Sequence, residues 1–221
     1  RRLGPSLSKA IIFDFDGTLV DSEKSIYKCF QSITKQLAPE RVNYAENILI
    51  GPPLRDTASE ILGPRNQNQL DKFVDLFIQM HDEQVIQHTQ PYPDVIEVLK
   101  KLYAKNILMA IATNKRLVPT KKLIDHFGWE DYFLFIECSN SEYQIRNKNE
   151  MIKDILKLNK DFKNSHYVGD TVNDGISANL NNIKFIKASY GYGKNQDWSN
   201  VHITESIESI VEIEEIFFKS T

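Results

Sequence analysis

The sequence predicts an α/β protein built on a parallel sheet, with a helical segment inserted near its start. Three observations carry this prediction. Short apolar runs typical of buried strands recur at residues 10–13, 107–112 and 165–168. Segments with helical spacing alternate with these runs, which favours parallel strands joined by right-handed crossovers. Residues 21–91, by contrast, contain helical patterns and no comparable strand.

The first strand ends in two acidic residues. Ala10-Ile11-Ile12-Phe13 is followed directly by Asp14-Phe15-Asp16-Gly17-Thr18. Ligands of open α/β sheets bind just beyond the carboxyl ends of the strands, so two carboxylates placed there indicate a functional site. An Asp-Gly turn with a spare acid would explain the same letters, and residues further along the chain must decide between the two.

The inserted segment contains two long apolar stripes with helical spacing. Ser22 is expected to cap the first helix, which ends before Pro39. The apolar residues of the stripes are Ile26, Phe30, Ile33 and Leu37 in the first, and Leu70, Phe73, Val74, Phe77 and Met80 in the second. The sequence Pro91-Tyr92-Pro93 then breaks the helical pattern. We therefore expect a helical cap over residues 21–91, and a catalytic core formed by residues 1–20 and 92–221.

Strands and helices alternate through the rest of the core. We expect helices over residues 95–102 and 117–127, strands over 133–138 and 183–186, and a final amphipathic helix over 207–218. This alternation predicts a Rossmann-like parallel sheet with helices on both faces.

Polar groups also follow the later strands. Thr113, Asn114 and Lys115 end the run at 107–112, and Gly169-Asp170-Thr171-Val172-Asn173-Asp174 ends the run at 165–168. Lys148 lies near the start of the helix expected after residue 138. Because the carboxyl ends of parallel strands meet at one sheet edge, these groups and the Asp14 pair should form one site.

The order of these motifs resembles that of the haloacid dehalogenase superfamily, in its phosphatase form. Further segments resemble the phosphoglycolate phosphatase and pyrophosphatase-like branch, which carries an α-helical cap. They are Asp16-Gly17-Thr18-Leu19-Val20-Asp21-Ser22, Tyr92-Pro93-Asp94, Ala112-Thr113-Asn114-Lys115 and Tyr190-Gly191-Tyr192-Gly193. The resemblance spans nearly the whole chain.

The resemblance implies four catalytic residues. Asp14 would be the nucleophile that forms an aspartyl-phosphate, and Asp16 the general acid and then the base that activates water. Thr113 would hydrogen-bond the transferring phosphoryl group. Lys148 would pair with Asp14 and the phosphoryl oxygens. The superfamily lysine is often followed by proline, whereas Asn149 follows here, and Lys153 is an alternative.

The resemblance also implies a cofactor and binding residues. Asp14, Asp170 and the backbone carbonyl of Asp16 would bind Mg²⁺, which prefers oxygen ligands. Asp174 would orient a metal-bound water or the lysine without binding the ion itself, although an acid at the start of a helix is a nearly equal interpretation. The other expected contacts of phosphate or substrate are Gly17, Thr18, Asn114 and the cap residue Arg55; an exposed helix-start arginine is an equally good interpretation of Arg55.

These expectations lead to a magnesium-dependent phosphatase acting on small phosphorylated metabolites. Phosphoglycolate-like acids, sugar phosphates, nucleotides and pyrophosphate remain open as substrates. A phosphosugar mutase would use the same residues, and a non-catalytic binder of a phosphorylated ligand is a further alternative.

Composition and charge limit the kinds of partner, and the cellular location, that we expect for this chain. The 221 residues carry a net charge of −3 with scattered basic residues, which argues against a nucleic-acid surface. Only two cysteines, Cys29 and Cys138, are present, so we expect neither a disulfide framework nor a cysteine metal site, and a cytoplasmic location. No apolar run is long enough to cross a bilayer, and no signal peptide is expected before the first strand. The oligomeric state stays open.

Overall fold

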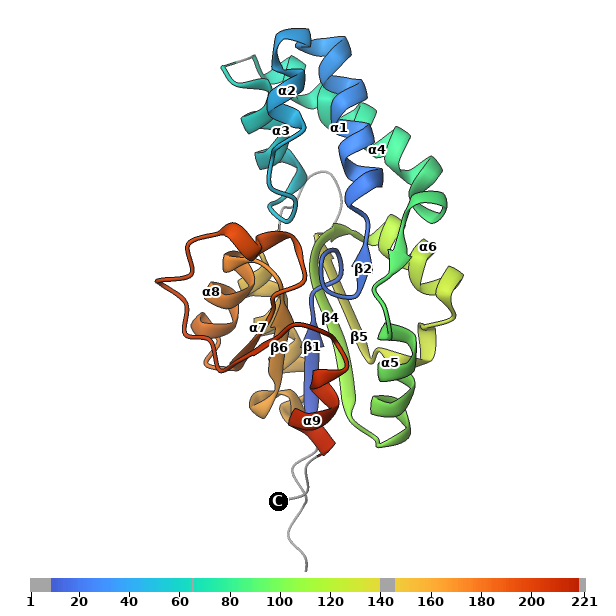
Figure 1. Ribbon diagram of the computed structural model, residues 1–221, viewed down its shortest axis with the longest axis vertical. Coiled ribbons are helices and arrows are strands. Elements are labelled where there is room, and N and C mark those ends of the chain that lie inside the picture. Colours follow the sequence, from blue (N-terminus) through green and yellow to red (C-terminus); the bar gives the residue numbers. More distant parts are fainter. Residues whose placement is uncertain (1–8, 65, 140–145, 219–221) are drawn as a thin grey trace, which may run out of the picture.

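The structure is a computed structural model that describes residues 9–64, 66–139 and 146–218. Figure 1 shows a sheet domain with a helical unit above one end of its sheet. The first residues of the predicted core, 1–8, lie outside the described part of the chain. Within that part, no helix is both long enough and apolar enough to span a membrane.

The core contains a six-stranded sheet in which every neighbouring pair of strands is parallel. The strand order is β5-β4-β1-β6-β7-β8, which places β1 between β4 and β6. The strands are β1 (Ala10–Phe13), β4 (Leu108–Arg116), β5 (Phe135–Ser139), β6 (His166–Gly169), β7 (Lys184–Ala188) and β8 (Glu205–Ile207). The predicted α/β fold with a Rossmann-like parallel sheet is confirmed.

Helices cover both faces of this sheet, and the residues of β1 show how. Ile11 and Phe13 pack into a cluster that includes α5, α6 and α9, while Ala10 and Ile12 pack into a second cluster with α7 and α8. The four residues of β1 are therefore buried on alternating faces, which explains the uninterrupted apolar run. The helices are α5 (Val95–Ala104), α6 (Leu117–Phe127), α7 (Lys148–Leu158), α8 (Val172–Leu180) and α9 (Glu212–Phe218).

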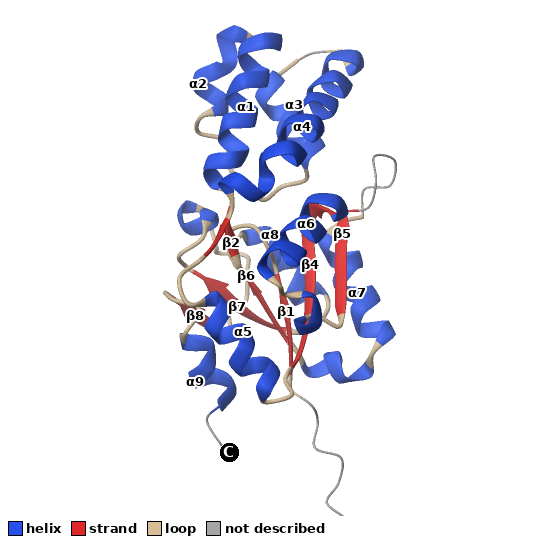
Figure 2. Cartoon of the chain, turned by 90° about the vertical axis from the view of Figure 1, so that its right-hand side faces the viewer, coloured by secondary structure: helices blue, strands red, loops and turns tan. Residues whose placement is uncertain are grey.

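The segment between Asp21 and Gln90 forms the helical unit, which we call the cap (Figures 1 and 2). Its helices are α1 (Glu23–Leu37), α2 (Val42–Ala45), α3 (Leu54–Leu62) and α4 (Gln67–His88), with a short 3-10 helix at Pro39–Arg41. The apolar stripes of α1 and α4 face each other: the ring of Phe30 lies 6.2 Å from that of Phe73 and 5.1 Å from that of Phe77. The cap therefore has an apolar core of its own.

Two short antiparallel strands connect the cap to the core. They are β2 (Val20–Asp21) and β3 (Gln90–Pro91), which pair Val20 with Pro91 and Asp21 with Gln90. The chain therefore leaves and re-enters the core at neighbouring points.

Two local expectations are corrected. The predicted terminal helix over 207–218 is shorter, because residues Glu205–Ile207 instead extend the sheet as β8, paired with β7. Ser22 does stand at the start of α1, but its hydroxyl makes no cap hydrogen bond. That hydroxyl donates to Asp16 instead, at 2.6 Å.

Candidate active site

Asp14 lies at the carboxyl end of the central strand and is almost completely buried, with 4% of its surface exposed. Its backbone N–H donates to the carbonyl of Val168 in β6 at 2.8 Å, which continues the parallel pairing beyond Phe13. The strand end therefore fixes where this carboxylate stands.

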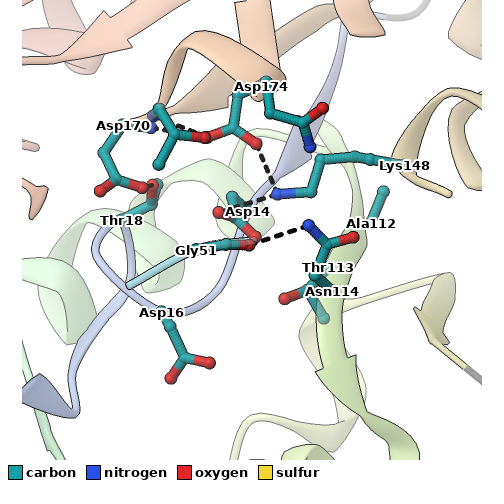
Figure 3. A network of polar contacts seen from close by, with 12 residues as sticks. Asp14, Asp16, Thr18, Gly51, Ala112, Thr113, Asn114, Lys148, Asp170 and Asp174 are labelled. Atoms are coloured by element: carbon teal, nitrogen blue, oxygen red, sulfur yellow. Dashed lines mark hydrogen bonds and ion pairs between the residues drawn. The ribbon is translucent and has the colours of Figure 1, made fainter. Parts of the chain in front are cut away.

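Lys148 is the cation that meets Asp14. Its Nζ atom lies 3.0 Å from Oδ2 of Asp14 and 2.5 Å from Oδ1 of Asp174 (Figure 3). A capping box just before it, in which Asn147 and Glu150 exchange side chain to backbone hydrogen bonds, fixes the start of α7 and hence the position of Lys148. Lys153, the alternative, is exposed further along the same helix.

Asp170 and Asp174 complete a buried acidic cluster with Asp14. One carboxylate oxygen from each of the three lies within 4.8 Å of the others. Asp174 also caps the start of α8: its Oδ2 accepts from the backbone N–H of Asp170 at 3.1 Å and of Thr171 at 2.8 Å, the latter as part of a capping box with Thr171. The second Asp174 oxygen is the one that holds Lys148, so this residue links the helix start to the lysine.

The loop after Asp14 packs tightly against Asp170. The hydroxyl of Thr18 donates to Oδ1 of Asp170 at 3.2 Å, and the backbone N–H of Tyr192 donates to Oδ2 at 2.7 Å. Gly17 has a φ of +83°, and a Cβ there would lie 2.3 Å from Asp170 Oδ2. Glycine thus permits both the turn and the close approach, and Gly17 and Thr18 lie against Asp170.

Asp16 stands apart from this cluster (Figure 3). Lys115 Nζ donates to its two carboxylate oxygens at 3.0 and 3.1 Å, and the Ser22 hydroxyl donates to Oδ1. The side chain of Lys115 is only 5% exposed. In this conformation Asp16, the predicted acid/base, therefore points toward Lys115 and Ser22, where the cap joins the core, rather than toward Asp14.

Thr113 and Asn114 lie at the end of β4, the neighbour of β1. Thr113 is buried, and its hydroxyl oxygen accepts from the backbone N–H of Lys115 at 3.2 Å. The side-chain amide of Asn114 donates to the backbone carbonyl of Gly51 in the cap at 2.9 Å. Asn114 thus joins the core to the cap loop that lies over the site (Figure 3).

Arg55 is the one predicted binding residue that the structure holds elsewhere. It lies on α3 and forms an ion pair with Asp71 on α4. Its guanidinium group is thereby engaged within the cap.

Burial and charge shape the electrostatics of the cluster. Burial raises the pKa of Asp14 to about 7, although the ammonium group of Lys148 opposes that rise. Burial, reinforced by Asp174 and Asp14, raises the pKa of Asp170 well above its usual value. Burial alone would lower the pKa of Lys148, but Asp14 and Asp174 together raise it.

The cluster has the properties of a divalent cation site. Three carboxyl groups lie together in a buried space, and the ammonium group of Lys148 contacts two of them, Asp14 and Asp174. All the candidate ligand atoms are oxygens, the donor type that Mg²⁺ prefers. The residues present therefore fit a magnesium ion.

Three residues near the site stand out only in the structure: Lys115, His81 and Tyr192. The sequence places Lys115 after a strand and Tyr192 in a motif without assigning either a role, and it singles out no role for His81. The register shift of β4 between Thr113 and Arg116 lies where Lys115 turns to Asp16, and sequence patterns carry no signal for such an irregularity.

Comparison with known proteins agrees with this geometry. The family model of haloacid dehalogenase-like hydrolases matches residues 11–188. The chain belongs to this family. The matched range includes the acidic cluster, Lys148 and the whole cap, and it confirms the superfamily expected from the motifs.

Named relatives of this haloacid dehalogenase-like hydrolase are phosphatases. A phosphoglycolate phosphatase from Agrobacterium fabrum is 27% identical over 192 residues, covering 84% of this chain and 82% of its own. Pyrophosphatase PpaX from Listeria innocua is 27% identical over 175 residues, covering 77% and 78%. A haloacid dehalogenase-like hydrolase structure from Streptococcus pneumoniae superposes with a TM-score of 0.79 at 22% identity, covering 96% of this chain and 99% of that one, and supports the fold.

Proposed function

We propose that this protein is a magnesium-dependent phosphatase that hydrolyses small phosphomonoesters through an aspartyl-phosphate on Asp14. The observation that carries the proposal is the position of Lys148 between two buried acids, Asp14 and Asp174. A carboxylate attacks a phosphate dianion only where positive charge offsets the repulsion between them. The names of the relatives support the same reaction class.

In the first half-reaction, an Asp14 oxygen attacks phosphorus and the bond from phosphorus to the ester oxygen breaks. Asp16 gives its proton to the departing oxygen. In the second, water attacks the phosphorus of the aspartyl-phosphate, Asp16 takes a proton from that water, and Asp14 is released. Since Asp16 points toward Lys115 here, its side chain must turn toward Asp14 before it serves either step.

The other residues of the site position the phosphoryl group and neutralise its charge. Lys148 balances the charge of Asp14 and of the incoming phosphoryl group, while Asp174 holds Lys148 in place. The Thr113 hydroxyl, near the carboxyl end of β4, donates to a phosphoryl oxygen. Gly17 and Asn114 complete the phosphate-binding surface, and Thr18 donates a hydrogen bond that supports Asp170. Asp14, Asp170 and the backbone carbonyl of Asp16 would hold a magnesium ion, which would neutralise charge on the phosphoryl group.

Substrates of this site are small phosphorylated metabolites such as phosphoglycolate-like acids, sugar phosphates, nucleotides or pyrophosphate. The two buried cysteines, both unpaired, support work in a reducing compartment such as the cytoplasm.

Phosphate release tests the proposal. The protein is incubated with a panel of these phosphomonoesters and pyrophosphate, with and without Mg²⁺, beside the variants Asp14→Asn and Asp125→Asn. Asp125 is an exposed acid on α6 and serves as the matched control. We expect Mg²⁺-dependent release that Asp14→Asn abolishes and Asp125→Asn retains. Release that persists in Asp14→Asn would refute the aspartyl-phosphate, and absence of release from every compound would refute the phosphatase.

A further inference from the structure

A small cavity lies between the cap and the core next to Asp16. Its volume is about 80 Å³, and it is lined on the core side by Asp16, Asn114 and Lys115. The cap side is largely apolar, formed by Ile26, Phe30, Ile50, Leu54 and Phe77. The proposed acid protonates the departing oxygen once its side chain has turned toward Asp14, so the group bonded to that oxygen lies on the Asp16 side of the site. This cavity borders Asp16 and Asn114 on that side.

The size and walls of the cavity limit what enters it. Pockets for drug-sized ligands measure about 300–1,000 Å³, so this cavity accepts a group of only a few atoms. The apolar wall favours carbon over a second phosphoryl group. A short carbon chain therefore fits better than a nucleoside or the second half of pyrophosphate.

Lys115 supplies the one ammonium group among the residues that line this cavity. Its side chain is almost fully buried and forms an ion pair with Asp16. The neighbouring cation, Arg116, is already engaged with Asp82 on α4. An anion that enters the cavity can therefore take the place of Asp16 as the partner of Lys115.

An unpartnered histidine on the cap side is an independent sign of a polar ligand. His81 lines the same cavity and is 3% exposed, yet its Nε2 atom has no hydrogen-bond partner among the described residues. Its Nδ1 atom lies 3.9 Å from Oδ1 of Asp82, and its ring stacks on Phe77. Buried polar atoms of native proteins are nearly always paired, so this nitrogen indicates a group that the bound state supplies.

We propose that Lys115 is a specificity-determining residue that binds a carboxylate on the leaving group of the substrate, with His81 as a second contact. In binding that carboxylate, Lys115 gives up its ion pair with Asp16 and leaves the Asp16 side chain free to turn toward the departing oxygen. The preferred substrates are then short phosphorylated hydroxy acids. This inference rests on the proposed phosphatase function.

Kinetics with two matched esters test the inference. The substrates are 2-phosphoglycolate and 2-hydroxyethyl phosphate, in which a hydroxymethyl group replaces the carboxylate, with pyrophosphate as the arm for a second phosphate. A hydrogen-bonded ion pair in a buried site is worth about a 10- to 100-fold preference. We expect the wild-type protein to prefer the acid by that factor in kcat/KM, and to hydrolyse pyrophosphate more slowly than the acid.

Variants of Lys115 test whether this residue causes the preference for the acid over the neutral ester. In Lys115→Met the preference should fall close to one, through a rise of KM for the acid, while turnover of the neutral ester is kept or raised. Lys115→Arg, which retains the charge, should retain the preference. Lys121→Met removes an exposed lysine on α6 and should change nothing. Equal use of both esters by the wild-type protein, or an unchanged preference in Lys115→Met, would overturn the inference.

Calorimetry separates this inference from the proposed function. In the Asp14→Asn background, 2-phosphoglycolate should bind more tightly than 2-hydroxyethyl phosphate, and adding Lys115→Met should remove the difference. This result would stand even if no phosphate were released from any ester. Equal binding of the two esters would refute recognition of the carboxylate while leaving the phosphatase intact.

Discussion

The Nζ atom of Lys148 lies 3.0 Å from Oδ2 of Asp14, in a place where 2% of the lysine and 4% of the aspartate are exposed. Removing one partner of a buried ion pair costs about 3–5 kcal/mol, because the other charge is left without a partner. Lys148→Met should therefore lower the free energy of unfolding by about that amount and suppress phosphate release by at least about 100-fold.

Denaturant unfolding and phosphate release measure both effects of Lys148→Met. Lys153→Met, an exposed position on the same helix, is the control and should change neither quantity. Full activity in Lys148→Met would show that the lysine is structural only.

Gly191 lies against the acidic cluster in a way that tolerates no side chain. A Cβ there would stand 2.2 Å from the Cβ of Asp170 and 2.3 Å from the carbonyl oxygen of Gly17. Gly191→Ala should destabilise the protein by about 1–3 kcal/mol through overpacking. Displacement of Asp170 by about 1 Å should also reduce phosphate release by about 100-fold.

Gly128→Ala is the matched control for Gly191→Ala. Gly128 ends α6 with a φ of +67°, and nothing lies within 4 Å of its added Cβ. The Gly128→Ala substitution should lower the free energy of unfolding by about 1 kcal/mol, because alanine is strained at this positive φ, and should leave catalysis unchanged. Equal loss of activity in both variants would argue against a specific contact with Asp170.

The two thiols should be inert in the folded protein. Burial raises the pKa of Cys29 to about 11 and that of Cys138 to about 12, so neither is ionised at pH 8. Iodoacetamide should leave both unmodified in native protein and label both after unfolding in guanidinium, as read by mass spectrometry. Rapid labelling of native protein would show that one of these sites opens.

Acid should weaken the fold through His166. Burial, with Lys184 nearby, lowers the pKa of this imidazole from 6.5 to about 4. Between these pH values the unfolded chain binds a proton that the folded protein does not. The free energy of unfolding is therefore not lowered by this group above pH 6.5, and it falls as the pH drops from 6.5 toward 4.

Denaturant unfolding between pH 4 and 7 measures this dependence on pH. His166→Gln should show a shallower loss of stability over that range than the wild-type protein. His202→Gln, at an exposed position, should follow the wild-type curve. Identical curves for all three proteins would exclude a contribution from His166.

The main features of the fold could be predicted from the sequence because local patterns determine them. Ala10-Ile11-Ile12-Phe13 reads as a buried strand since both faces of β1 are covered, and the stripes of α1 and α4 face each other within the cap. The meeting of Asp14 with Asp170 follows from parallel pairing of β1 with β6. These inferences need periodicity and topology only.

The contacts that depend on cap packing could not be predicted. The ion pair of Arg55 with Asp71 is one of them: it arises from the packing of α3 on α4 and joins residues 16 positions apart, which periodicity does not specify. His81 follows Phe77 by one helical turn and looks like part of the cap core. Its unpaired nitrogen becomes visible only when α4 is placed over the end of β4.

The side-by-side strands β2 and β3 make the cap a separable module. Since Asp21 pairs with Gln90 in an antiparallel ladder, a two-residue Asn-Gly turn can join them directly. That deletion removes all four cap helices and retains every strand of the six-stranded sheet. Beyond this ladder, the cap meets the core through side-chain contacts such as Asn114 with Gly51 and Arg116 with Asp82. Changes in the cap helices can therefore alter selectivity while the strands that carry the acidic cluster stay in place.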